Sequence, residues 1–300
     1  MSLINVCNIS DMSFSEKLEV NLISAFDWGF VNRGGYINVN INQTGAYVDN
    51  RSILEKVNDL SSTGVLYCGP ENWVYESDVS STPAPLVPLI YVNNILDVSG
   101  AVNYRDGIVK PSVFVPSTGI VKARFSYKWV TFTSARKSNS RRQIQYRQTR
   151  TDLNKVDVGI PAEIKVPLPT VTIDVPSVTK SKQYDIMRYG SRLYLHDVNM
   201  YIIGESASDV VKICDIICSQ AGDVMNSFDP KLVIQADDFP LKFDGTVNSG
   251  KNHDQLAEDY PWAPIKILSA ESMWSGYLNE HIYQAIVRIK TELRLCLGCT

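Results

Sequence analysis

Short β-like runs separated by turn signals fill residues 36–132, and they limit what the N-terminal part of this 300-residue chain can fold into. The turn signals are Asn93-Asn94, Asp106-Gly107 and Ser117-Thr118-Gly119. The runs between them are GVLYC, WVYES, PLIYVNNIL, GIVKPSVFV and VKARFSYKWVTF. Strands of this length joined by tight turns are typical of small β-sandwiches and barrels.

A helix is predicted ahead of these strands. Ser13 and Glu16 have the spacing of a capping box, and Gly29 is placed to end the helix. Between them, apolar residues recur at helical intervals, at Leu18, Leu22, Ala25 and Phe26. We therefore predict that residues 1–132 form one domain, a helix docked on a small β-sandwich or barrel.

Residues 157–300 are predicted to form a second, α+β domain. AEIKVPLPTVTIDVP indicates one or two strands at a sheet edge, because three prolines interrupt it. SRLYLHDVNMYIIG and PKLVIQA are interpreted as strands, and EHIYQAIVRIKTELRL as a long strand for which a helix is the alternative. Ser206 is a suitable N-cap for a helix that ends near Gly222. The expected fold is an antiparallel sheet with one main helix.

Two charged stretches are the candidate sites of interaction. A basic arm or linker covers residues 133–156 and contains Arg136, Lys137, Arg141, Arg142, Arg147 and Arg150. An acidic loop covers residues 237–264 and contains Asp237, Asp238, Asp254, Glu258 and Asp259. The net charge of the chain is −3, so its basic character is local, which argues against a protein that coats DNA.

The composition is that of a soluble globular protein. The N-terminus has no secretory pattern, and no apolar run is long enough to cross a bilayer, so we expect a cytoplasmic site of synthesis and no membrane partner. The six cysteines are scattered, which favours free thiols in a reducing compartment.

Motifs for enzyme chemistry are weak. GTVNSGKN matches the G-x4-G-K spacing of a phosphate loop, but Asn252 replaces the Ser or Thr that holds Mg²⁺, and neither flank fits, so a surface loop is expected. Cys214 and Cys218 lie on the apolar stripe of the predicted helix, and Cys296 and Cys299 form a C-x-x-C near the C-terminus. The histidines show no zinc-ligand spacing. We expect no cofactor, no metal and no enzyme activity.

A series of longer phrases is distinctive in its order and spacing. They are ISAFDWGFVNRGGYINVNI, NWVYESDV, IYVNNIL, NYRDGIV and FSYKWVTF, followed by LPTVTIDVP, YLHDVNMYIIGES and DVVKICDII. Up to about residue 218 the chain thereby resembles a family of tailed-bacteriophage virion structural proteins. Its members look like neck or tail-completion components, which join the head connector to the tail tube. By analogy of element order, the second domain looks like a tail terminator, a fold that assembles into a hexameric ring.

The resemblance implies a structural protein of the virion, assembled in the host cytoplasm, without catalytic residues. Its partners would be copies of itself in a ring, expected to be a hexamer, together with connector or stopper, tail-tube and sheath proteins. DNA would pass through without specific binding. The acidic loop departs from the compact pattern, which leaves terminator and stopper both open.

The basic arm has three interpretations. It contacts the acidic loop of a neighbouring subunit, which we favour; it binds DNA; or it is a solvated linker. Two other functions stay open. Aromatic residues exposed on one face of the first domain would favour a virion adhesin or tail-fibre adaptor, and a deep polar pocket would favour an enzyme.

Overall fold

The chain forms two compact units in the computed structural model. Unit 1 contains residues 1–27, 131–236 and 253–300, and unit 2 contains residues 28–130 and 237–252. The residues that the structure describes are 12–41, 50–57, 65–116, 118–136, 168–176, 180–183, 191–242, 244–279 and 282–296.

Unit 1 is built on a seven-stranded sheet. The strands follow the order β13-β14-β15-β12-β10-β9, and β11 pairs with β12 beside this path. Their bounds are β9 (Thr131–Ser134), β10 (Thr170–Asp174), β11 (Lys180–Gln183), β12 (Ser191–Gly204), β13 (Val224–Met225), β14 (Ile265–Asn279) and β15 (Ile282–Cys296). Pairing is antiparallel except between β10 and β9, which are parallel.

The long strands confirm the alternation seen in the sequence. β15 pairs with β12 in unbroken antiparallel register from Cys296 opposite Ser191 to Tyr283 opposite Gly204. Val287, Ile289 and Leu293 of β15 are buried, as expected for the inward face of a strand with period two. The strand interpretation of residues 282–296 is therefore confirmed.

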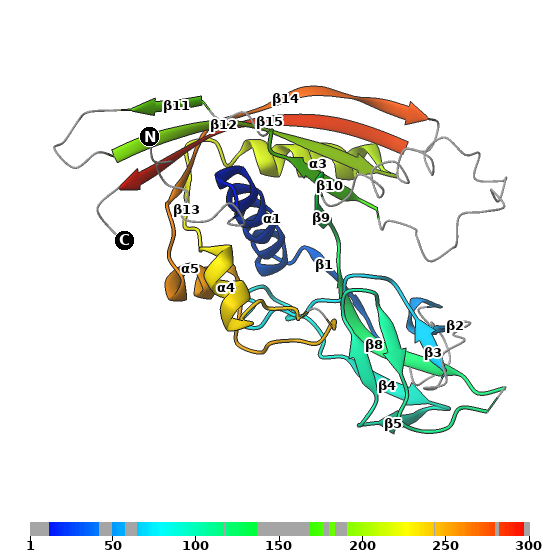
Figure 1. Cartoon of the computed structure of the whole chain (residues 1–300). Coiled ribbons are helices and arrows are strands. Elements are labelled where there is room, and N and C mark those ends of the chain that lie inside the picture. The colour runs from blue at the N-terminus through cyan, green and yellow to red at the C-terminus, as the bar shows by residue number, and fades with distance from the viewer. Residues whose placement is uncertain are drawn as a thin grey trace. The chain divides into compact units, whose positions relative to one another are not determined.

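Two helices cover one face of this sheet (Figure 1). α3 (Ala207–Cys218) packs on β12, β14 and β15, and Ser206 caps it by accepting a bond from the Asp209 amide, as the sequence predicted. α1 (Phe14–Asn32) stacks Phe14 on Tyr194 of β12 and Phe26 on Phe132 of β9. Leu18, Leu22 and Phe26 of α1 are buried, so the predicted apolar stripe is confirmed.

The prediction that Gly29 ends α1 is wrong, because the helix continues to Asn32. Gly34 ends it instead, at a φ of +86°. The Gly34 amide bonds to the Val31 carbonyl and the Gly35 amide to the Phe30 carbonyl, a pair of bonds that forms a Schellman motif.

Two short helices replace predicted irregular or extended structure. PKLVIQA, interpreted as a strand, is α4 (Pro230–Ala236). The acidic stretch 237–264 contains α5 (His253–Asp259), and unit 2 ends at Asn252 just before it, so the stretch is not one loop. The Asp229 amide bonds to the Tyr260 carbonyl over 2.8 Å, which holds the two helices side by side (Figure 1).

β10 lies inside the sheet, so the edge position predicted from its prolines is wrong. Residues 131–134 occupy the edge instead, because Thr170–Ile173 pair in parallel with Thr131–Ser134. This pairing also moves the division of the chain. The predicted regions were 1–132, 133–156 and 157–300, whereas β9 and the α1 residues up to Asp27 belong to unit 1.

Unit 2 is a small sandwich of two four-stranded sheets. One sheet has the order β1-β8-β4-β5 and the other β2-β3-β7-β6. Their bounds are β1 (Tyr36–Val39), β2 (Glu55–Val57), β3 (Leu66–Cys68), β4 (Leu89–Val92), β5 (Ile95–Asp97), β6 (Ala101–Asn103), β7 (Ile108–Lys110) and β8 (Val121–Lys128), with a 3-10 turn at Asn50–Ser52. The shared core includes Val39, Ile90 and Phe125 from the first sheet and Tyr67 and Val109 from the second.

The turns of unit 2 follow from the predicted turn residues. Asn93 and Asn94, with φ of 51° and 66°, join β4 to β5 as a two-residue hairpin turn requires. Gly107, at a φ of 62°, lies against the Pro70 carbonyl, where a Cβ would come within 2.2 Å of the oxygen. The β-sandwich and the α+β class are both observed in the structure.

Candidate interaction sites

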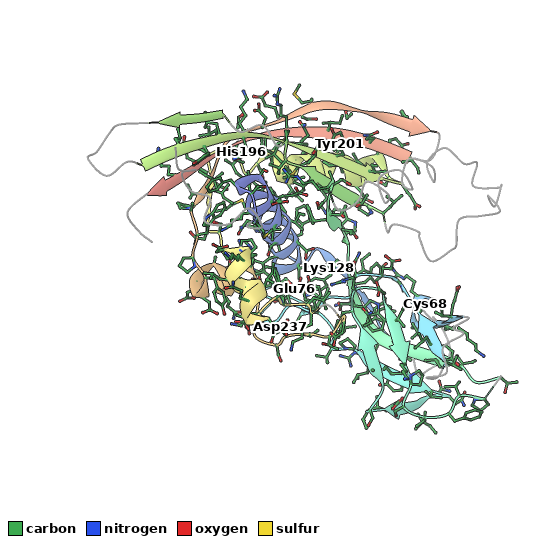
Figure 2. The ribbon with its side chains drawn as sticks, viewed as in Figure 1. Cys68, Glu76, Lys128, His196, Tyr201 and Asp237 are labelled. Carbon is green, nitrogen blue, oxygen red and sulfur yellow. The ribbon has the colours of Figure 1, made fainter. Side chains whose placement is uncertain are left out.

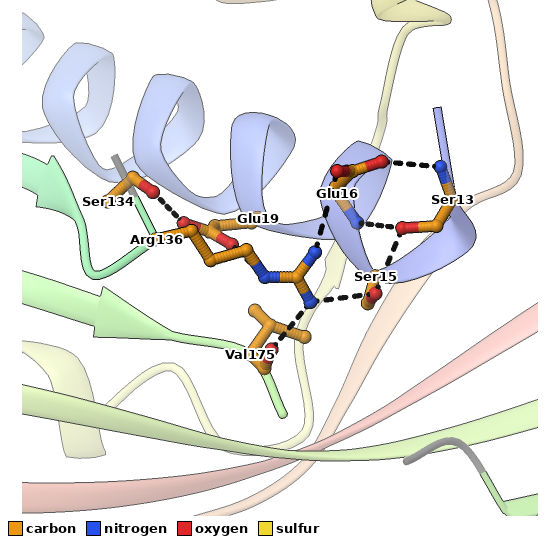
Figure 3. Close-up of polar contacts among 7 residues, drawn as sticks. All are labelled: Ser13, Ser15, Glu16, Glu19, Ser134, Arg136 and Val175. Carbon is orange, nitrogen blue, oxygen red and sulfur yellow. Dashed lines mark hydrogen bonds and ion pairs between the residues drawn. The ribbon is translucent and has the colours of Figure 1, made fainter. Parts of the chain in front are cut away.

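Arg136, the first candidate of the basic stretch, is bound within unit 1 (Figure 3). One guanidinium nitrogen donates to Ser15 Oγ and to the Val175 carbonyl, each over 2.8 Å. Nε lies 3.2 Å from Glu19 Oε2, and a further nitrogen lies 3.8 Å from Glu16 Oε1. Arg136 thus links α1, β9 and the end of β10, and 31% of its side chain is exposed.

The first turn of α1 supplies the acceptors for Arg136. The Ser13 amide donates to Glu16 Oε2 over 2.6 Å, and the Glu16 amide donates to Ser13 Oγ over 3.3 Å, so the predicted capping box is confirmed (Figure 3). Glu19 follows one turn later and accepts a bond from Ser134 Oγ of β9. Burial raises the pKa of the Glu19 carboxyl, and Ser134 and Arg136 oppose that rise.

Backbone hydrogen bonds also hold the residues that precede the rest of the basic stretch. The Ala135 amide donates to the Ile173 carbonyl over 2.9 Å, and the Thr131 amide donates to the Pro169 carbonyl over 3.1 Å. The strands that precede and follow segment 137–167, β9 and β10, are thus neighbours at the edge of the sheet. The remaining basic candidates, Lys137, Arg141, Arg142, Arg147 and Arg150, lie outside the described residues.

The acidic candidates belong to two different units. Asp237 and Asp238 lie in unit 2, where Asp237 is 3.7 Å from Lys242 Nζ and Asp238 is 3.1 Å from Lys251 Nζ. The other three acids, Asp254, Glu258 and Asp259, are exposed on α5 of unit 1. The predicted single acidic loop is thus two separate groups of acids, one in each unit.

The phosphate-loop pattern lies on a turn of unit 2. Gly245 adopts a φ of 83° and is buried against Asn103, where a Cβ would clash, and its carbonyl accepts from the Tyr104 amide over 3.1 Å. Leu241 and Val247 form an isolated bridge on either side of it. The arrangement differs from a strand that leads directly into a helix N-terminus, which phosphate binding by this motif requires.

A buried ion pair in unit 2 was missed by the sequence reasoning. Lys128 Nζ lies 2.5 Å from Glu76 Oε1, and only 5% and 4% of the two side chains are exposed (Figure 2). The ammonium also lies 3.9 Å from the centre of the Tyr75 ring, a cation–π distance. Alternation along β8 predicts that Lys128 faces solvent. Residues 72–74 instead pair alongside the end of β8, where the Val74 amide donates to the Ser126 carbonyl and the Lys128 amide to the Asn72 carbonyl. This pairing brings Tyr75 and Glu76, which follow it, to the Lys128 side chain.

Two histidines are buried in unit 1. His196 of β12 is 2% exposed, and burial lowers its pKa with help from the Arg136 charge. His253 opens α5, with Nδ1 3.1 Å from Ser24 Oγ and Nε2 3.1 Å from the Asn226 carbonyl. Burial lowers the pKa of His253 as well.

The cysteines of the apolar stripe of α3 face the interior of unit 1. Burial raises the pKa of Cys214 to about 11, which keeps it a thiol.

Four observations bear on the class of the protein. Within the described ranges, His, Cys, Asp and Glu form no group of three or more that could hold a metal ion. In the same ranges, no helix has both the length and the hydropathy for a bilayer span. No protein-family model matches the sequence, and a comparison with curated proteins finds no match either.

Proposed function

We propose that the chain is a structural subunit of a bacteriophage neck that joins the head connector to the tail tube as a tail terminator or completion protein. In this proposal it acts through contacts between subunits in a closed ring. The observation that carries the proposal is the anchored origin of the basic stretch. Arg136 is bound to α1 and to the end of β10, and both ends of segment 137–167 adjoin paired strands.

The described residues that flank the charged segment belong to the edge of the sheet of unit 1. Such a segment favours one register and one orientation of a partner, although each exposed pair contributes only about 0–1 kcal/mol. A head-to-tail contact of this kind repeats around a ring. The exposed acids of α5 give unit 1 a surface of opposite sign.

The proposal extends to partners and location. Copies of the chain form the ring, for which we propose a hexamer, and connector, stopper, tail-tube and sheath proteins stack on it. The assembled location is the virion. DNA passes through without specific binding, because a conduit that held its cargo through many phosphate contacts would retard it.

The adhesin alternative is less favoured. A glycan-binding face would require exposed aromatic side chains on unit 2, whereas Trp73, Tyr67 and Phe125 are core residues. Phe114, at 88% exposure, has aliphatic neighbours in the sequence, the exposed Val113 and Val115, which packs against the core. Aliphatic neighbours suit contact with a protein better than they suit a sugar ring.

Class-averaged electron microscopy with mass measurement of the purified chain tests the proposal. We expect a closed ring of one symmetry, alone or after mixing with connector or tail-tube protein. Arg142→Glu combined with Arg147→Glu should weaken the ring. Lys56→Glu combined with Lys290→Glu is the matched control, because it makes the same change in net charge at exposed positions outside the basic stretch. A strictly monomeric particle at micromolar concentration in every mixture would contradict the proposal.

A further inference from the structure

Strand β14 lies at the rim of the sheet of unit 1 and leaves one edge of it open (Figure 1). β13 pairs only with Ile265 and Lys266 at the start of β14, and the Ile267 amide donates to the Asp223 carbonyl. Over residues 268–279, β15 pairs with one side of β14 and no described strand pairs with the other. Every second residue of an antiparallel strand turns its N–H and C=O groups away from its partner. This edge therefore presents a row of backbone groups that have no partner strand in the described chain.

The open part of β14 lacks most of the side chains that keep edge strands apart. Edge strands of soluble proteins are commonly short, or carry lysine, proline or several charges. Residues 268–279 contain no lysine and no proline, and their one charged residue is Glu271. Met273 and Tyr277 are 56% and 68% exposed, so apolar side chains lie in solvent along the same edge. Both the backbone and the side chains of this edge favour association with another strand.

Bulges limit the length of β14 that can pair. The register with β15 shifts three times, and the last two shifts lie between Ser272 and Trp274 and between Tyr277 and Asn279. A bulge disrupts the ladder locally and bends its strand, which protects most of the edge. Residues 274–277 lie between these two shifts and keep regular pairing with β15. A partner strand can therefore align regularly only around this stretch.

We propose that β14 pairs antiparallel with β14 of a second copy, about a two-fold axis at Ser275. The axis passes through a residue, because outward and inward groups alternate along the strand and two facing residues must point the same way. An axis at Ser275 sets Met273 opposite Tyr277, so the exposed apolar side chains of the two copies meet. The same register sets Glu271 opposite Asn279, which keeps the two carboxylates at opposite ends of the contact.

A second copy suits this edge because the edge is complementary to itself. The backbone groups of one β14 meet the same groups of the other, and no like charges face each other in this register. Tyr277 already stacks on Tyr283 of β15, with ring centres 4.5 Å apart, so part of the contact is ordered before association. The contact uses the same surface on both copies and closes on itself. It thus goes beyond the head-to-tail contact of the proposed ring and does not depend on it.

Analytical ultracentrifugation over a range of concentrations tests this contact. Met273→Lys combined with Tyr277→Lys brings like charges together across the axis, at positions whose exposure should preserve folding. We expect dimerisation to weaken by about tenfold or more. Val87→Lys combined with Val211→Lys is the matched control. It makes the same change in net charge at apolar positions that are 71% and 51% exposed and lie outside β14.

Ser275→Cys tests the position of the axis. Two thiols introduced at the axis lie opposite each other, at a separation that a disulfide can span. Ser269→Cys is the control, because it lies six residues from the axis. Its two copies would be about 40 Å apart at the rise of an extended strand. Mild oxidation should link two chains of the Ser275→Cys variant and none of the Ser269→Cys variant. Mass spectrometry of the linked peptides separates this bond from bonds of the native cysteines.

The outcomes separate this contact from the proposed ring. Dimerisation unchanged by the two lysines, or no link through position 275, would overturn the contact. Rings without the link would overturn the contact and leave the proposed function standing, as would an edge that binds only an extended peptide of another protein. Linked dimers that never form rings would support the contact and contradict the proposed function. A wild-type chain that stays monomeric would overturn both.

Discussion

Both units bury a glutamate beside a cation, but they solvate the cation differently. In unit 2, Lys128 and Glu76 are each about 5% exposed or less, and the ammonium is enclosed by Glu76 and the Tyr75 ring. In unit 1, Glu19 is equally buried, whereas its partner Arg136 keeps 31% of its side chain in solvent. The pair in unit 2 is closed to water, and the pair in unit 1 has one open side.

This difference in the exposure of the cation gives the two buried ion pairs different roles. A closed pair has lost the hydration of both ions, so each ion depends on the other. An open pair retains hydration on one side, and Arg136 has further acceptors in Ser15 and Val175. The arginine can therefore end a strand and begin a charged segment without burying its whole charge. In unit 2 the ion pair stabilises the fold. In unit 1 the ion pair fixes the residue at which the basic stretch begins.

The largest effect is expected at Glu76. Glu76→Gln leaves the Lys128 ammonium buried without its counter-ion, which should cost about 3–5 kcal/mol in the free energy of unfolding of unit 2. Urea unfolding, followed together with amide hydrogen exchange in β8, measures the loss. Lys128→Met in the same chain should restore most of it, because the orphaned charge is then gone. A double variant as unstable as Glu76→Gln alone would contradict this account.

Glu19→Gln is expected to cost much less, roughly 1 kcal/mol, because the guanidinium of Arg136 stays partly hydrated. The amide oxygen of the introduced glutamine can still accept the bond from Ser134, and Arg136 keeps its bonds to Ser15 and Val175. Exchange of the Ala135 amide, which bonds to the Ile173 carbonyl, reports directly on this junction. A loss in the free energy of unfolding as large as that from Glu76→Gln would show that the partial hydration of Arg136 does not lower the cost of removing its counter-ion.

Local patterns predicted the elements that stabilise themselves along the sequence. Three such patterns are observed: the capping box at Ser13, the apolar stripe of α3 and the alternation of β15. Each of them is formed by residues that are close together in the sequence. The residues of α4 were interpreted as a strand. Its signal was nevertheless local, because Asp229 caps the helix by accepting from the Lys231 amide and Pro230 occupies the first turn.

Pairings between distant residues could not be predicted from one sequence. The parallel contact of β9 with β10 links Thr131 to Thr170 and carries no local mark, yet it sets the sheet edge and the division into units. Arg136 was singled out as a basic residue, but its acceptors lie on α1 and after β10. The burial of Lys128 likewise depends on the distant residues 72–76, which pair alongside β8 and bring Tyr75 and Glu76 to a side chain that alternation assigns to solvent.

The buried histidines are expected to have the smallest effect on the free energy of unfolding at neutral pH. This effect grows only as the pH falls. The three histidines of the chain all belong to unit 1, and none lies in residues 28–130 or 237–252. The folded pKa values of His196 and His253 lie below the ordinary value of 6.5, so the unfolded chain takes up protons first as the pH falls. Their contribution to stability is complete above pH 6.5 and is lost as the pH falls through the folded pKa values.

Glu19 acts in the opposite direction. Its folded pKa is raised above 4.5, so its protonation on acidification favours the folded state and offsets part of the loss. With two histidines against one glutamate, we expect the amides of β12 and β15 to lose protection as the pH falls below 6.5, while those of β4 and β8 in unit 2 keep theirs. His253→Gln should reduce the pH dependence of unit 1, because the glutamine amide does not titrate. Equal slopes for the two units, unchanged by His253→Gln, would mean that the histidines do not distinguish them, and that the contrast between a closed and an open ion pair is the main electrostatic difference.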